Sequence, residues 1–261
     1  MQQAQDFFIE NEKISTLIRG LDDAALSMPT KFKNWTIIEI IRHLHMWNVA
    51  AHYSLIDEAV FDSFFDDLSD FLSKGELREF EKIFVDGQNG QSMVAIWQDF
   101  YPRLFGAFTQ IDPKKRVKWA GPSMSAKSSI TARLMETWAH GQAIFDILGV
   151  LRPERDSTLR NITILGINSL GFNHKIRKLH APEILPRLTL TAPSGEIWEF
   201  GEDENNSIKG SAVGFCQTIT QCRNVADTDI IATGPIAQNW MAIAQCFAGR
   251  PHDPPKIGTR I

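Results

Sequence analysis

Residues 36–57 read TIIEIIRHLHMWNVAAHYSLID, and this stretch decides the fold. Apolar side chains recur in it at positions i, i+3, i+4 and i+7, namely Ile37, Ile40, Ile41, Leu44 and Trp47. This period of about 3.6 residues is that of an amphipathic helix. We therefore expect a long helix over residues 36–57 whose apolar stripe faces a core.

The sequence on either side of this stretch also has helical periodicity. We expect three further long helices, at about residues 6–28, 92–109 and 128–148, which end near Pro29, Pro113 and Gly149 respectively. The apolar and acidic region 61–81 is expected to be a shorter helical excursion. Four long helices of this kind suggest an up-down bundle.

The pattern changes after residue 150. The segment 149–157 combines glycine, proline and charged residues, which is typical of a domain boundary, and we predict domains at 1–151 and 152–261. In the second domain we expect helices at 158–180, 211–222 and 235–249, a hairpin over 188–200 and a short strand at 229–232. The predicted fold class is α+β, with an N-terminal four-helix bundle followed by a smaller α+β domain.

Composition excludes several classes of protein. The chain has 261 residues, of which 43% are apolar, and this excludes a disordered protein. With 27 basic and 31 acidic side chains the net charge is -4, which provides no general attraction to phosphate backbones. The densest basic run, residues 114–118, is interpreted as a solvated turn. A nucleic-acid partner is therefore not expected.

Targeting and cysteine signals are also missing. The first residues have no basic and apolar pattern of a signal peptide, and no apolar run approaches the roughly 18 residues of a membrane span. Cys216, Cys222 and Cys246 have no CxxC spacing, so neither a disulfide framework nor a thiolate zinc site is predicted. We expect a cytoplasmic protein without a membrane partner.

Glu136 and His140 are the first candidate site residues. They lie four positions apart in a predicted helix, so both side chains project from one face and can hold one cation between them. Ala143 and Ile147 continue the same line, which indicates that the carboxylate and the imidazole lie on an inward face. A polar pair in this position forms either a structural hydrogen bond or a metal site.

The helix over residues 36–57 offers a third ligand. His43 and His45 lie about 200° apart around that helix, so only one of them can reach the same ion. The helical geometry alone does not choose between these two histidines.

Two motifs carry a family resemblance. The first is Asn34-Trp35-Thr36-Ile37 through Ile41-Arg42-His43-Leu44, and the second is Met135-Glu136-Thr137-Trp138-Ala139-His140-Gly141-Gln142 followed by Leu148-Gly149. Both resemble the metal-binding domain of mycothiol-dependent maleylpyruvate isomerases, a DinB-like four-helix bundle. The resemblance selects His43 over His45 and implies a His43, Glu136 and His140 metal site. Such ligands suit zinc with a fourth position open, and also nickel or iron.

The resemblance extends into the second domain through residues 191–195, 215–223 and 239–249. It implies that Arg223 is the catalytic arginine of the family. One position departs from the family pattern, because many members carry Asp after the His-Gly-Gln segment and this chain has Ala143. A carboxylate that orients a metal ligand is therefore expected to be missing.

The resemblance implies a metal-dependent transferase or isomerase. A low-molecular-weight thiol would be the co-substrate, a small electrophile would be the substrate, and Arg223 would neutralise a substrate carboxylate. Two alternatives remain open at this point. One is metal-assisted hydrolysis without a thiol, and the other is a non-catalytic module that binds metal or a small ligand.

Overall fold

The computed structural model describes residues 1–260. The chain forms two compact units, Met1–Ile147 and Leu148–Ile261. The predicted α+β class, with a helical bundle first and a smaller α+β domain second, is confirmed. The division between the units falls slightly before the expected boundary at 151/152, because the last helix of the bundle ends at Ile147.

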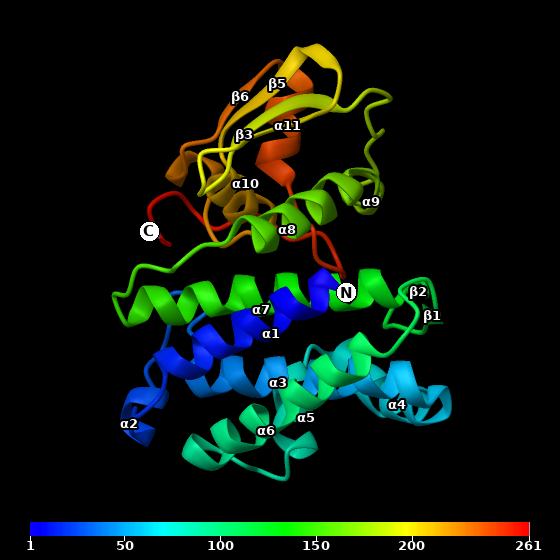
Figure 1. Cartoon of the computed structure of the whole chain (residues 1–261), viewed down its shortest axis with the longest axis vertical. Coiled ribbons are helices and arrows are strands. Elements are labelled where there is room, and N and C mark those ends of the chain that lie inside the picture. The colour runs from blue at the N-terminus through cyan, green and yellow to red at the C-terminus, as the bar shows by residue number, and fades with distance from the viewer. Residues whose placement is uncertain (261) are drawn as a thin grey trace. The chain divides into compact units, whose positions relative to one another are not determined.

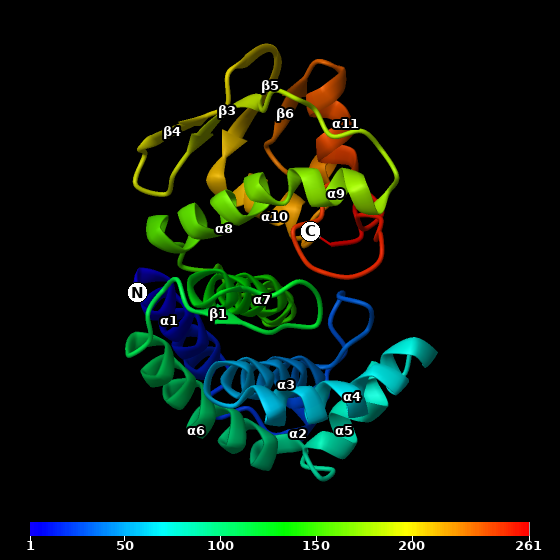
Figure 2. The ribbon, with the colours of Figure 1, turned by 90° about the vertical axis from the view of Figure 1, so that its right-hand side faces the viewer.

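Four long helices build the first unit. They are α1 (Gln2–Leu17), α3 (Ile37–Ile56), α6 (Gly90–Thr109) and α7 (Ala126–Ile147). α1 and α3 each pack against both α6 and α7, as can be followed in Figures 1 and 2. α1 and α7 run in one direction and α3 and α6 in the other (Figure 1). The neighbours α3 and α6 are therefore parallel, and a strictly alternating bundle was the wrong expectation.

The connection between α3 and α6 explains this arrangement. Parallel neighbours need a long crossover, and α4 (Glu58–Lys74) and α5 (Leu77–Phe84) provide it. They are the helical excursion expected at 61–81. α5 packs against α3, so the crossover lies beside the helix that carries His43. Periodicity predicts which face of a helix is buried but not the direction of its neighbours.

The expected helix at 6–28 is two helices. α1 ends at Leu17, and a single further turn forms α2 (Asp23–Leu26). Gly20 between them has a φ of +81°, a left-handed conformation that interrupts helical geometry. At the other end of the bundle, β1 (Arg116–Val117) and β2 (Met124–Ser125) form a small antiparallel pair between α6 and α7.

The start of α3 is fixed by its own side chains. Thr36 Oγ1 accepts a hydrogen bond from the Glu39 backbone N–H at 3.3 Å, and Glu39 Oε2 accepts one from the Thr36 N–H at 2.8 Å. This capping box satisfies two backbone donors that have no partner inside the helix. It fixes Thr36 as the residue before the first turn, which places His43 on the second turn of the helix.

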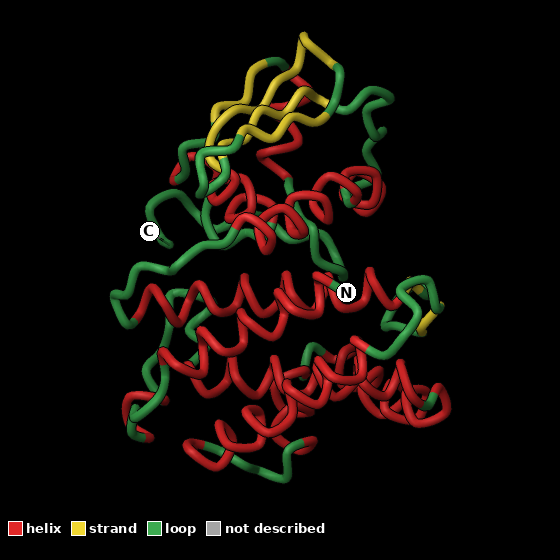
Figure 3. Tube along the Cα trace, in the orientation of Figure 1, coloured by secondary structure: helices red, strands yellow, loops and turns green. Residues whose placement is uncertain are grey.

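The second unit contains a four-stranded sheet in the order β4-β3-β5-β6, drawn in yellow at the top of Figure 3. The strands are β3 (Pro186–Thr191), β4 (Ile197–Phe200), β5 (Asp203–Ser211) and β6 (Ile231–Thr233). β3 pairs antiparallel with β4, as the expected hairpin, and parallel with β5. β5 was not predicted, because its sequence DENNSIKGS is polar.

The helices of the second unit are α8 (Asp156–Asn168), α9 (Leu170–Ile176), α10 (Ala212–Ile219) and α11 (Pro235–Ile243), with a 3-10 turn η1 (Val225–Asp227). α10 packs against β3, β5 and α8, and α11 packs against β5 and β6. The helix expected at 158–180 is broken at Ser169, and the last helix ends before its expected end at 249. Within residues 1–260, no helix is both long and apolar enough to cross a membrane.

Candidate metal centre

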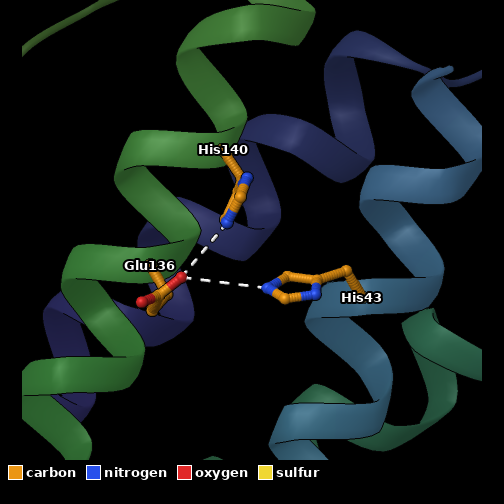
Figure 4. A group of neighbouring side chains, drawn as sticks. All are labelled: His43, Glu136 and His140. Carbon is orange, nitrogen blue, oxygen red and sulfur yellow. Dashed lines mark ion pairs between the residues drawn. The ribbon is translucent and has the colours of Figure 1, made fainter. Parts of the chain in front are cut away.

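Two helices of the bundle bring three potential metal ligands together. His43 lies on the second turn of α3, and Glu136 and His140 lie one turn apart on α7. His140 Nε2 lies 3.1 Å from Glu136 Oε2, and His43 Nε2 lies 3.9 Å from the same oxygen. One potential ligand atom from each residue lies within 4.8 Å of the other two. All three side chains point into the space between α3 and α7 (Figure 4).

The environment of these side chains favours an ionised carboxylate. Burial opposes the charge on Glu136, but the hydrogen bonds with His140 and His43 outweigh it and hold the pKa of this carboxyl below its ordinary value. Burial also lowers the pKa of His140, against the opposing effect of Glu136. A carboxylate and a neutral imidazole are the forms that donate electron pairs to a metal.

His43 is held from the side opposite to Glu136. Its Nδ1 lies 2.6 Å from Oε1 of Glu81, a carboxylate on α5 whose side chain is completely buried. Burial works against a charged ring here, but the carboxylates of Glu81 and Glu136 outweigh it and raise the pKa of His43. Each nitrogen of the His43 ring therefore faces a carboxylate oxygen.

Glu81 is paired in turn with Arg78. The Nε of Arg78 lies 3.1 Å from Oε2 of Glu81, and its Nη2 lies 2.7 Å from Oε1 of Glu39. The guanidinium also lies over the ring of Trp35, 4.1 Å from its centroid. A planar cation suits these contacts, because it can form ion pairs at its edge while its face stacks on an aromatic ring.

Aromatic rings surround the imidazoles. The Trp35 ring is parallel to the His140 ring, with centroids 5.6 Å apart, and it meets His43 at 5.1 Å in an edge-on contact. Phe32 meets His140 edge-on at 4.9 Å. Lys33 and Asn34, between these two aromatic residues, have φ angles of 51° and 58°. The segment before α3 therefore uses two left-handed residues to place Phe32 and Trp35 against the histidines.

The other two sequence candidates, His45 and Arg223, have different surroundings. His45 is buried on α3 but packs edge-on against Phe100 of α6, with centroids 5.4 Å apart. Of the two histidines that helical geometry could not separate, His43 is the one beside Glu136 and His140. Arg223 belongs to the second unit, where it is buried and its Nη1 donates a hydrogen bond to the Cys222 carbonyl at 3.1 Å.

Glu81 and Arg78 were missed by the sequence analysis, although one signal for Glu81 existed. Leu77, Phe80, Glu81 and Phe84 follow the helical i, i+3, i+4, i+7 pattern, so a carboxylate interrupts an apolar stripe. The same reasoning drew attention to Glu136. A carboxylate from α5 thus faces His43, in a chain that has Ala143 where the resemblance led us to expect an aspartate.

The sequence was compared with known proteins. Residues 8–145 match the family described as the mycothiol maleylpyruvate isomerase N-terminal domain. This match covers more than half of the chain and contains all three residues of the cluster. The chain belongs to this family.

Similarity to other proteins extends beyond the N-terminal domain and covers most of the chain. An uncharacterized protein of Mycobacterium tuberculosis, found in strains CDC 1551 and H37Rv, is 33% identical over 258 residues, which is 94% of this chain and 95% of the relative. A crystal structure of the mycothiol-dependent maleylpyruvate isomerase has a TM-score of 0.57 at 15% identity, over 88% of this chain and 91% of that one. The crystal structure of a histidine-to-alanine mutant of that enzyme has a TM-score of 0.56 at 16% identity, again over 88% of this chain and 91% of that one. At this identity the two crystal structures support the fold.

Proposed function

We propose that this chain binds a divalent metal ion through His43, Glu136 and His140 and uses it in a thiol-dependent isomerase or transferase reaction. The observation that supports the proposal most directly is the convergence of two imidazole nitrogens and one carboxylate oxygen within 4.8 Å. Glu136 and His140 are one helical turn apart on α7, but His43 comes from α3, about 90 positions earlier in the sequence, so chain proximity does not explain why it meets them.

The separations between the ligand atoms suit a metal ion. Two bonds of about 2.1 Å at a tetrahedral angle place ligand atoms about 3.4 Å apart. The separations of 3.1 and 3.9 Å from Glu136 Oε2 lie on either side of this value. The two-histidine, one-carboxylate set suits zinc and also nickel or iron. A small adjustment of His43 toward Glu136 would complete the site.

Three protein ligands would leave one position of a tetrahedral metal ion open to a reacting molecule. Of the residues that the structure describes, only these three form a cluster of potential ligands, and His45 is not among them. Structural zinc sites are closed by four protein ligands, whereas catalytic sites keep one position open. Three ligands therefore favour a catalytic role over the non-catalytic metal module.

The protein residues of the proposed site have separate roles. His43 and His140 supply neutral nitrogen donors, and Glu136 supplies the negative charge that partly balances a divalent ion. When bound, such an ion acts as a Lewis acid and lowers the pKa of a thiol or water in its open position. The aromatic rings of Phe32 and Trp35 limit the access of water to the histidines.

The reaction class is proposed from the relatives. The solved isomerase is described as mycothiol-dependent, so a low-molecular-weight thiol is the proposed co-substrate and a small electrophile the proposed substrate. Arg223 is the proposed catalytic arginine, which would neutralise a carboxylate of that substrate. The buried position of its side chain would strengthen such an ion pair by excluding water.

Metal analysis tests the site. We expect about one divalent ion per chain in the untagged wild-type protein, and loss of that ion in His43→Ala and His140→Ala, because each substitution removes one of three ligands. His52→Ala is the matched control, since His52 lies on the same helix outside the cluster and packs against Phe100. Metal binding that survives both ligand substitutions, or none in reconstituted wild type, would contradict the proposal.

Thiol dependence tests the reaction class. Maleylpyruvate isomerisation is measured with metal-loaded protein in the presence of mycothiol, of glutathione and of no thiol. Turnover that requires a thiol and is lost in His140→Ala supports the proposal. Hydrolysis of ester or amide probes without any thiol would instead favour the metal-dependent hydrolase. Arg223→Ala should reduce thiol-dependent turnover without loss of metal.

A further inference from the structure

We propose that Glu81 is a positioning residue, which orients His43 so that its Nε2 faces the metal ion. This inference rests on the proposed metal site and deepens it. The family motifs that point to the three ligands do not include Glu81, which comes from the crossover helix α5. Its completely buried carboxylate accepts a hydrogen bond from Nδ1 of His43 at 2.6 Å.

The geometry determines which nitrogen is available to a metal. Nδ1 and Nε2 lie on different sides of an imidazole ring, and a neutral ring carries a proton on only one of them. A separation of 2.6 Å between His43 Nδ1 and Glu81 Oε1 leaves room for a shared proton and none for an ion. In the neutral ring that would bind a metal, the proton therefore lies on Nδ1, and the lone pair is on Nε2, the nitrogen on the side of Glu136.

The carboxylate of Glu81 is itself held in place. A buried carboxylate needs a compensating charge, and Arg78, one turn earlier on α5, supplies it at 3.1 Å. Arg78 also pairs with Glu39, the residue that completes the capping box of α3. Ion pairs thus link Glu39, at the start of α3, through Arg78 to Glu81, which contacts Nδ1 of His43 on the same helix.

Arg78 also acts on the second imidazole, by a different route. Its guanidinium stacks on Trp35, and that ring in turn stacks parallel to His140 and meets His43 edge-on. Among the described residues, His140 Nδ1 is buried and has no hydrogen-bond partner. Both imidazoles thus contact Trp35 and Glu136, but only His43 has a carboxylate on its Nδ1. This contrast makes Glu81 the specific support of His43.

The test compares zinc affinities. Zinc dissociation constants of wild type, Glu81→Gln and Glu79→Gln are measured by competition with a chromophoric chelator. Loss of a carboxylate that orients a histidine ligand typically weakens metal binding by 10- to 100-fold, and we expect a loss of about this size for Glu81→Gln. Glu79→Gln removes the same charge from the same helix at an exposed position and should bind zinc like the wild type.

Two further readouts separate positioning from folding. The cobalt-substituted proteins are compared by visible absorption, because a reoriented His43 changes the ligand field even at saturating metal. In the zinc-loaded wild type, ¹⁵N chemical shifts of the His43 ring report which nitrogen carries the proton. We expect a protonated Nδ1 and a metal-bound Nε2. This second measurement needs no variant, so it applies even where Glu81→Gln does not fold.

The outcomes distinguish the inference from the function on which it rests. Wild type that binds no zinc contradicts the metal site itself. The role of Glu81 is overturned if wild type binds zinc, the zinc dissociation constant of Glu81→Gln is within twofold of the wild-type value, and the cobalt spectrum is unchanged. This result leaves the metal site standing. Metal on Nδ1 of His43 also overturns it. Weaker zinc binding, an altered cobalt spectrum and a protonated Nδ1 support it.

Discussion

At the scale of single residues, the informative feature of this sequence is a polar side chain in an apolar stripe. Glu136 and His140 stood out in this way, and the cluster is completed by His43 from another helix. The sequence could not decide between His43 and His45 by geometry, since the choice depends on which face of α3 meets α7. Glu81 carried the same signal in the shorter helix α5, but its partner, His43, is known only once α5 is seen to pack against α3.

A second observation at this scale concerns a buried thiol. Burial raises the pKa of Cys216 above its ordinary value, against the opposing hydrogen bond with Thr163. In the unfolded chain this thiol ionises near its ordinary pKa, whereas in the folded protein it stays protonated. The unfolded state then binds fewer protons, so stability falls as the pH rises past the ordinary pKa.

We predict that Cys216→Ala reduces this alkaline loss of stability. The contribution of one such group reaches about 1.4 kcal/mol per pH unit. Free energies of unfolding are measured in urea at pH 7 and pH 10 for both proteins. The difference at pH 7 reports the lost packing, and the change of that difference at pH 10 reports the thiol. An identical pH dependence in the two proteins would show that Cys216 does not contribute.

At the scale of elements, the local sequence predicted helices better than it predicted strands or the relative directions of neighbouring helices. The long helices of the bundle have strong periodicity, and the structure has a helix in each expected region. β5 escaped notice because only Asn206 and Ile208 of its residues are buried. It becomes a strand by pairing with β3 and β6, which is a tertiary effect. The break at Ser169 is likewise not marked by proline, and the glycines on either side of it, Gly166 and Gly171, both lie within helices.

The turn between β4 and β5 yields a prediction at this scale. Gly201 has a φ of +72°, and a Cβ there would lie 2.1 Å from the Pro186 carbonyl oxygen. We expect Gly201→Ala to lower the free energy of unfolding by more than 2 kcal/mol, since left-handed strain alone costs about 1 kcal/mol and the clash adds to it. Urea unfolding measures the loss.

Gly195 is the matched control for that substitution. Its φ is +89°, but a Cβ there would meet nothing within 4 Å. Gly195→Ala should therefore show the conformational cost of about 1 kcal/mol alone. Equal losses for the two substitutions would mean that the backbone near Pro186 moves aside without cost.

At the scale of the whole molecule, the division into two compact units determines where a metal can act on stability. The three proposed ligands all belong to Met1–Ile147, on α3 and α7. A ligand that binds only the folded state stabilises it by RT ln(1 + [L]/Kd), about 2.7 kcal/mol at a concentration 100 times Kd. We expect this stabilisation to be largest in α3 and α7, the helices that carry the proposed ligands.

We predict that zinc slows amide hydrogen exchange in α3 and α7 and leaves exchange in β3 and β5 unchanged. Exchange that proceeds by local or unit-wise opening reports the stability of each region separately. Full-length protein is compared with and without zinc, and His140→Ala serves as the control in which no region should respond. Equal protection of β3 and β5 would mean that the two units open together, so that metal binding in the bundle stabilises the whole chain. Protection that persists in His140→Ala would instead place the zinc outside the proposed site.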